Sequence, residues 1–214
     1  MAGYFELSVV ALGRFNPAIF QPSWFRTNDI LPAAEVDAAE AGGQRVLVTN
    51  DVTAIMFESV RVDVQKERWS LSTSRQDWRK DIGPIASSIF ALLPHTPVTT
   101  LGFNYSMHRY LVGGEPALSR LLHKWVPIED LADVVGKRVH LGGTVRCDWD
   151  DYRVTFTLDS SVRLTHGIYF GQNYERKVES ATMLTEYLQQ DWPKILSRAK
   201  DLIEAISEGE ELEA

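Results

Sequence analysis

The sequence predicts an α+β fold: an antiparallel or mixed sheet with helices packed on one face. Several segments alternate apolar and polar residues, which is typical of half-buried strands, and most of these segments are joined by short turns. Two longer segments carry apolar residues at helical spacing. The 214 residues are 44% hydrophobic and 24% charged, which are globular proportions that allow a substantial core.

The first predicted strand covers residues 4–15 and stops at Asn16-Pro17, because proline has no N–H to donate to a strand ladder. The aromatic segment 18–32 contains two prolines and predicts one or two short helical turns. The next segment, 33–44, is small, acidic and ends near two glycines. We expect a mobile loop there, with an Ala/Glu helix as the alternative.

A short strand and a hairpin are expected next. Residues 45–50 predict the short strand, and 54–64 predict one longer strand whose second half alternates valines with polar residues. Lys66-Glu67 forms the polar turn, after which the segment 68–74 returns as a strand.

A helix is predicted within 78–94, where isoleucines and leucines recur at helical spacing. Asp77 is one candidate for its N-cap. The alternative is a start near Gly83-Pro84, with proline in the first turn.

The second half of the chain follows a similar order. A strand over 98–110 precedes two predicted helices, and a meander of three strands then leads to a long helix that starts near Ser180. The two helices are expected over 116–126 and 127–136, and the meander strands over 138–149, 152–160 and 162–174.

Two pairs of short motifs suggest an internal duplication. LGRFN at 12–16 resembles LGFN at 101–104, and VRVDVQKER at 60–68 resembles VRCDWDDYR at 145–153. Two strand-hairpin-helix halves, 1–96 and 97–214, would then share one sheet. The alternative is coincidence, since short strand motifs recur by chance.

The strand 98–110 has two different faces. Leu101, Phe103 and Tyr105 lie on an apolar face that we expect to be buried. Asn104, Ser106 and His108 lie on the opposite, polar face. This face is either an ordinary solvated strand face, a patch that binds a ligand or partner, or the site of a small hydrolase that uses Ser106 and His108. A serine nucleophile usually sits on a sharp turn beside an oxyanion hole, and the sequence signals neither.

No metal or cofactor is predicted. The five histidines lack metal-ligand spacing, and the aspartates of CDWDDY fit a hairpin turn better than a carboxylate cluster. The glycine pairs do not form a phosphate-binding loop. No cluster of lysine and arginine stands out, so the sequence does not predict nucleic-acid binding.

Large aromatic residues crowd the proline-interrupted segment after the first strand. Such residues either fold onto the core or contact a partner, because aromatics dominate interface hot spots. The residues predicted to bind a partner are Phe15, Asn16, Phe20, Trp24 and Phe25, together with Asn104 and His108.

The compartment and function follow mostly from absences in the sequence. The single cysteine, Cys147, excludes an internal disulfide framework and favours the cytoplasm. The N-terminus does not resemble a signal peptide, and no apolar run predicts a membrane span. The acidic end, from Glu204 onward, is expected to be a solvated, fraying helix end.

We therefore predict a non-catalytic interaction protein, acting as an accessory subunit or as a self-assembling component of a complex. Its partner would be another protein or a second copy of the chain. The alternative is a small hydrolase that uses Asn104, Ser106 and His108.

Overall fold

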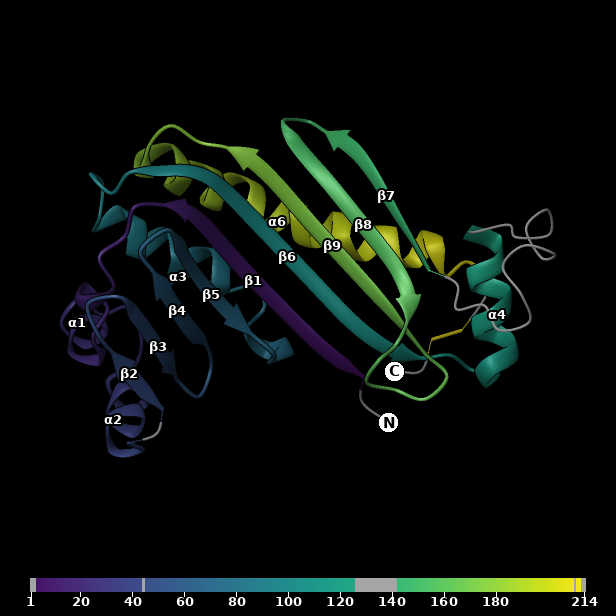
Figure 1. Cartoon of the computed structure of the whole chain (residues 1–214), viewed down its shortest axis with the longest axis horizontal. Helices are drawn as coiled ribbons and strands as arrows, with labels where there is room; N and C mark the ends of the chain where they lie inside the picture. The colour runs from purple at the N-terminus through teal and green to yellow at the C-terminus, as the bar shows by residue number, and fades with distance from the viewer. Residues whose placement is uncertain (1–2, 44, 126–141, 210, 213–214) are drawn as a thin grey trace. The chain divides into compact units, whose positions relative to one another are not determined.

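The computed structural model describes residues 3–43, 45–125, 142–209 and 211–212 (Figure 1). The chain is α+β, as predicted, with one nine-stranded antiparallel sheet of order β2-β3-β4-β5-β1-β6-β9-β8-β7. The strands are β1 (Tyr4–Gly13), β2 (Val46–Val48), β3 (Val52–Met56), β4 (Arg61–Gln65), β5 (Arg68–Thr73), β6 (Val98–Tyr110), β7 (Gly142–Trp149), β8 (Tyr152–Ser160) and β9 (Gly167–Lys177).

The helices lie between and after these strands. Within the described residues, no helix combines the length and the apolar character that crossing a bilayer requires. The helical elements are η1 (Pro17–Ile19), α1 (Pro22–Thr27), α2 (Ala33–Ala41), η2 (Gln76–Trp78), α3 (Ile82–Ala91), α4 (Gly114–Trp125) and α6 (Ala181–Ile206).

The chain divides into two compact units. The first unit contains Glu6–Asn104 and Glu175–Leu196, and the second contains Met1–Phe5, Tyr105–Tyr174 and Ser197–Ala214. The division passes through β1, β6, β9 and α6, each of which contributes residues to both units. The sequence halves 1–96 and 97–214 are a different division of the chain and stay a prediction.

In the core of the first unit, the buried side chains of the strands pack against helices α3 and α6. Trp69 of β5 is fully buried, and its ring lies 4.9 Å from that of Phe90 of α3. Phe103 of β6 packs at 5.5 Å against Trp192 of α6. Gly83 of α3 allows this packing, because a Cβ there would lie 2.3 Å from Cγ of Trp192. The predicted apolar face of β6 is thus confirmed as buried.

One prediction for the first unit is wrong. Residues 54–64 form no single strand: β3 ends at Met56, and β4 begins at Arg61 after a tight connection over 57–60. The break is not visible in the sequence, because Phe57 and Val60 are apolar like the residues of a buried strand; the structure shows that both are buried in the connection.

Of the two interpretations of the segment 33–44, the Ala/Glu helix is confirmed and the mobile loop is not, because Ala33–Ala41 forms helix α2. Alanine has the highest helix propensity. Val36 and Ala39 bury one face of this helix, and Arg26 of α1 forms ion pairs with Asp37 and Glu40. The start of the helix after β5 also matches the second alternative, since α3 begins at Ile82, close to Gly83-Pro84, and Asp77 lies in η2.

The second unit contains the hairpin of β7 and β8 and a buried polar chain. The Tyr174 hydroxyl donates to Gln172 Oε1 at 2.6 Å, and Gln172 Nε2 donates to the carbonyl oxygen of Ala199 in α6 at 2.9 Å. Burial raises the pKa of Tyr174 to about 12. The third meander strand starts later than predicted, at Gly167. The predicted helix over 127–136 lies outside the described residues.

The acidic C-terminal end is not a simple frayed helix. Helix α6 ends at Ile206, and Leu212 then forms an antiparallel bridge with Leu111. The Val112 N–H donates to the carbonyl oxygen of Glu211 at 2.8 Å. The acidic composition concealed this contact because the bridge uses backbone groups, which composition does not specify.

Candidate functional site

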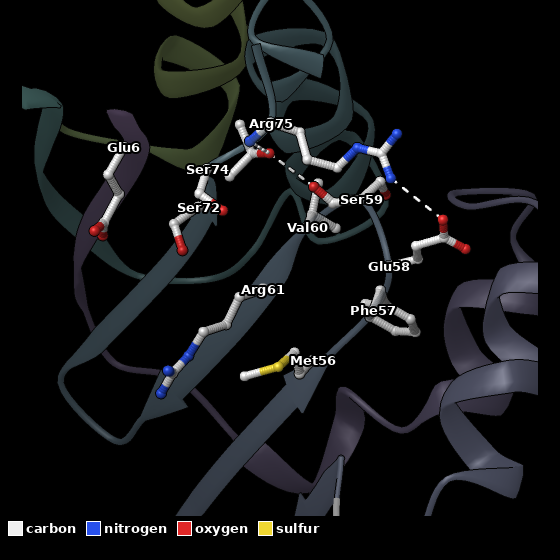
Figure 2. Close-up of a pocket in the computed structure, with 11 residues that line it drawn as sticks. Glu6, Met56, Phe57, Glu58, Ser59, Val60, Arg61, Ser72, Ser74 and Arg75 are labelled. Carbon is white, nitrogen blue, oxygen red and sulfur yellow. Dashed lines mark hydrogen bonds and ion pairs between the residues drawn. The ribbon is translucent and has the colours of Figure 1, made fainter. Parts of the chain in front are cut away.

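A pocket of about 280 Å³ opens where three strands of the first unit meet (Figure 2). Met56 ends β3, Arg61 begins β4, and Ser72 lies near the end of β5. Its lining residues share a position at this corner of the sheet: Glu6, Met56, Phe57, Glu58, Ser59, Val60, Arg61, Ser72, Thr73, Ser74 and Arg75.

Strand register explains which side chains reach the pocket. Arg61 pairs with Ser72, which in turn pairs with Ser8 of β1, so these three residues form one cross-strand row. Their sequence neighbours Val62 and Leu71 are fully buried on the other face. Each strand therefore presents its polar side chains to the open face that carries the pocket.

The connection 57–60 forms one wall of the pocket and is held from two sides. Both the backbone N–H and the hydroxyl of Ser59 donate to Glu35 Oε1 of α2. The Thr73 hydroxyl donates to the carbonyl oxygen of Ser59 at 2.7 Å. Phe57 packs against Phe25 of α1, with ring centroids 5.2 Å apart. This wall is a fixed part of the fold, because each contact joins it to a different element.

The charged groups at the rim of the pocket are two arginines, Arg61 and Arg75, and the carboxylates around them. Arg61 donates to both carboxylate oxygens of Asp63, at 2.6 and 2.8 Å. Arg75 donates to Asp77 Oδ2 at 3.0 Å and to Glu58 Oε1 at 3.2 Å, as Figure 2 shows for the Glu58 pair. These hydrogen bonds raise the pKa of both guanidinium groups, and the pKa of Asp77 is lowered by its bond to Arg75.

The lining itself is balanced, with Glu6 and Glu58 beside Arg61 and Arg75. Carboxylates outnumber guanidinium groups only when Asp63 and Asp77 are included, which lie outside the lining and pair with the two arginines. Because both arginines are already paired, a phosphate group would have to displace a carboxylate and would meet the remaining negative charge. This electrostatic balance disfavours an anionic ligand and favours one with basic groups.

The polar side chains of the pocket lining carry hydroxyl, carboxylate and guanidinium groups. The lining contains neither histidine nor cysteine. The Ser59 hydroxyl has a carboxylate partner, but Ser59 is only 4% exposed and the same carboxylate also accepts its backbone N–H. Within the described ranges, no group of three or more His, Cys, Asp or Glu side chains could hold a metal ion.

His108, predicted on a polar strand face, is buried at 7% exposure in the second unit. Its Nδ1 lies 2.8 Å from the Ser161 hydroxyl, which accepts the N–H groups of Arg163 and Leu164 at 3.1 and 2.9 Å. Since those two bonds occupy the lone pairs of the hydroxyl, its proton points to Nδ1, and His108 is the neutral Nε2–H tautomer.

The surroundings of His108 favour a structural role. Its ring packs at 4.9 Å from Tyr169 and at 6.3 Å from Tyr4. Burial, with a contribution from Arg163, lowers the pKa of His108. His108 thus holds the turn after β8 against β6, and its hydrogen-bond partner is Ser161 and not Ser106, the nucleophile of the hydrolase hypothesis.

Ser106 is half-buried on β6 in the second unit, and the remaining predicted site residues are placed in the first unit. Asn104 donates to the Ser8 hydroxyl at 3.2 Å, which adds it to the row that leads to the pocket. Asn16 caps η1 through its side-chain oxygen at 3.2 Å from Ala18 N.

Among the predicted aromatics, Phe15, Phe20 and Phe25 are buried in the fold and Trp24 is half-buried. Trp24 lines a shallow hollow of about 450 Å³ together with Ile19, which is 37% exposed. Most of the aromatic segment therefore packs as core, and the part that reaches the surface is the area around Trp24.

Comparison with known proteins assigns no family: no protein-family model matches the chain, and no curated protein matches it. The site therefore has to be interpreted from its own chemistry. Sequence reasoning missed Arg61 and Arg75, because each looks like an ordinary polar residue of a hairpin. The one available signal was the polar alternation of β4 and β5, and the break at 57–60 that brings these residues together was not predicted.

Proposed function

We propose that the chain is a non-catalytic interaction protein that binds a protein partner at the pocket of Figure 2. The observation that carries this proposal is the charged and exposed rim, which surrounds fixed walls and contains no reactive pair. Side chains of Arg61 and Arg75 are 53% and 43% exposed, and that of Glu58 is 72% exposed. Such groups can exchange their intramolecular partners for groups of another protein at little desolvation cost.

The partner is proposed to present lysine or arginine to the pocket. The excess of carboxylates at the rim supports this choice, and the formal net charge of -7 acts in the same direction at longer range. Met56 adds an exposed apolar side chain, 50% exposed, beside the charged groups. A mixture of apolar and charged groups is common at protein interfaces.

A charge reversal at the rim tests this function. Tagged wild-type chain and the Glu58→Lys variant are purified from the native host, and the co-purifying proteins are quantified by mass spectrometry. A partner that binds at the pocket is lost at least tenfold with Glu58→Lys, since a like charge replaces an attractive one. Its recovery from wild type also falls as the salt concentration rises.

Glu186→Lys is the matched control, because Glu186 is also exposed in the first unit but lies on α6, outside the pocket lining. The proposal requires Glu186→Lys to retain the partner. If both variants retain the same proteins as wild type, or both lose them equally, the pocket is not the binding site.

We also propose that the protein acts in the cytoplasm and that its fold arose by duplication. The exposed single Cys147 supports a reducing compartment. The strand order supports duplication, since β3-β4-β5-β1 read from one side corresponds to β7-β8-β9-β6 read from the other. In each half a helix, α3 or α6, follows its three-strand meander, which also fits the proposal of helices packed on one face.

A further inference from the structure

Strand β7 lies at one end of the strand order and pairs with β8 alone among the described strands (Figure 1). Its pairing with β8 runs without interruption from Gly142↔Asp159 to Trp149↔Tyr152. Edge strands are usually protected by shortness, by charged side chains, by proline or by a bulge, because their free N–H and C=O groups can pair with another strand. β7 has eight residues, no proline and no bulge, whereas the opposite edge strand, β2, has only three residues.

Most side chains of β7 are exposed, which leaves room for a further strand beside it. Thr144, Val145, Arg146, Cys147 and Asp148 are all exposed. Val145 is 43% exposed even though its cross-strand partner, Phe156, is buried. An added strand would place neighbouring side chains beside these residues on both faces of the sheet.

The order of charges on β7 selects its partner. Two copies of one strand can pair antiparallel around a two-fold axis that is perpendicular to the sheet. Residues that lie directly opposite each other must point to the same face, so the axis passes beside one central residue, which lies opposite its own copy. Centring on Arg146 would place two arginines opposite each other, and centring on Asp148 would oppose two aspartates.

Centring on Cys147 removes both conflicts. Arg146 of each copy then faces Asp148 of the other, which gives two ion pairs on one face of the extended sheet. On the other face, Val145 lies opposite Trp149, and the two Cys147 residues are direct neighbours. The strand is thus self-complementary in charge and in apolar character at this one register.

We propose that two copies of the chain associate by antiparallel pairing of β7 with β7 around Cys147. The inference rests on the proposed function as an interaction protein and names a second copy of the chain as one partner. The backbone hydrogen bonds of the added strand supply the attraction, and the Arg146–Asp148 pairs fix the register. The joined sheet would be continuous through both copies.

Oxidative cross-linking of the full chain tests the proposal. Directly opposite residues of antiparallel strands have Cα atoms about 4.5 to 5.5 Å apart, within the range of about 4.4 to 6.8 Å that a disulfide spans. A mild oxidant such as diamide, a diazene, accepts two electrons and two protons from the two thiols; it is reduced to the hydrazine, and the two sulfurs are joined in a disulfide. Wild type is expected to form a covalent dimer on non-reducing gels and to sediment as a dimer under reducing conditions.

Exchanging the charges at positions 146 and 148 distinguishes cross-linking in the proposed register from cross-linking by random collision. Arg146→Asp and Asp148→Arg, each alone, place like charges opposite each other twice and should slow cross-linking about tenfold. The double variant restores both pairs with exchanged signs and should recover the wild-type rate. In the matched control, cysteine is moved to Val162, which is 94% exposed in the same unit, as Cys147→Ser/Val162→Cys. This control should cross-link slowly.

A reduced wild type that sediments as a monomer, with cross-linking no faster than that of the Val162 control, would overturn the proposal. So would a double variant that cross-links as slowly as the single variants. Either result leaves the pocket proposal standing if Glu58→Lys still loses its co-purifying partner, so the two failures are distinguishable.

Discussion

Two polar clusters of this protein use similar groups for different purposes. In the first unit, the rim of the pocket holds arginines and carboxylates that remain largely exposed to solvent. In the second unit, His108 and Ser161 form a hydrogen-bonded cluster that is neutral, and His108 is almost completely buried. Exposure, and not composition, separates the two clusters, because exposed groups can exchange their partners with solvent or another protein and buried groups cannot.

The energetic consequences of the two clusters are opposite. Losing one group of a buried cluster leaves its partner without a hydrogen bond, which costs stability. Losing one group of an exposed ion pair costs little, because water replaces the partner. We therefore expect substitutions at His108 or Ser161 to act on folding, and substitutions at the pocket rim to act on binding.

The largest expected effect comes from the apolar core and sets the scale for both clusters. Phe103→Ala is expected to lower the free energy of unfolding by about 3 to 5 kcal/mol, because Phe103 is buried against Trp192. Chemical denaturation measures this change. Gln190→Ala, at an exposed position of helix α6, is the control and should change stability by less than about 0.5 kcal/mol.

Ser161→Ala is expected to cost about 1 to 3 kcal/mol, a smaller but still clear loss of folding free energy. The hydroxyl serves three partners at once, since it donates to His108 and accepts from the N–H groups of Arg163 and Leu164. Denaturation at neutral pH measures the loss. A variant as stable as wild type would show that these hydrogen bonds are not formed in solution.

The same cluster predicts a dependence of stability on pH. The pKa of His108 is lowered from its ordinary 6.5 in the folded protein, so between these two pKa values the unfolded chain binds more protons. The free energy of unfolding should therefore fall as pH is lowered through and below 6.5, and the contribution of His108 should be complete above it. His108→Gln should have a shallower slope between pH values of about 7.5 and 5.

The smallest effect on stability is expected at the pocket. Glu58→Lys should melt like wild type, because the Glu58 side chain is 72% exposed and its one ion pair, with Arg75, is at the surface. Thermal unfolding followed by circular dichroism measures this. A clear loss of stability would mean that the rim contributes to folding. The rim and the His108–Ser161 cluster would then not differ in function.

The sequence predicted the fold class and most of the elements because period-two and helical patterns are local. It correctly placed Leu101, Phe103 and Tyr105 in the core. It failed at 54–64, where two buried residues of a tight connection look like strand residues. It gave helix α2 only as the alternative to a loop, because the buried contacts that hold this helix depend on distant parts of the chain.

The candidate site was less predictable than the fold. The pocket depends on the register of β4 against β5, which places Arg61 beside Ser72, and register is a property of pairing and not of either strand alone. His108 was predicted on a polar face by alternation, but alternation does not show that the turn at Ser161 covers that face. Polar residues on strands thus need tertiary contacts before a role can be assigned.

Stability and partner binding, measured together in Ser161→Ala and Glu58→Lys, separate the structural cluster from the binding rim. Ser161→Ala is expected to have a lower melting temperature and to retain the co-purifying partner under conditions where it is folded. Glu58→Lys is expected to keep the wild-type melting temperature and to lose that partner. If binding is lost only in Ser161→Ala and stability is lost only in Glu58→Lys, the roles assigned to the two clusters are wrong.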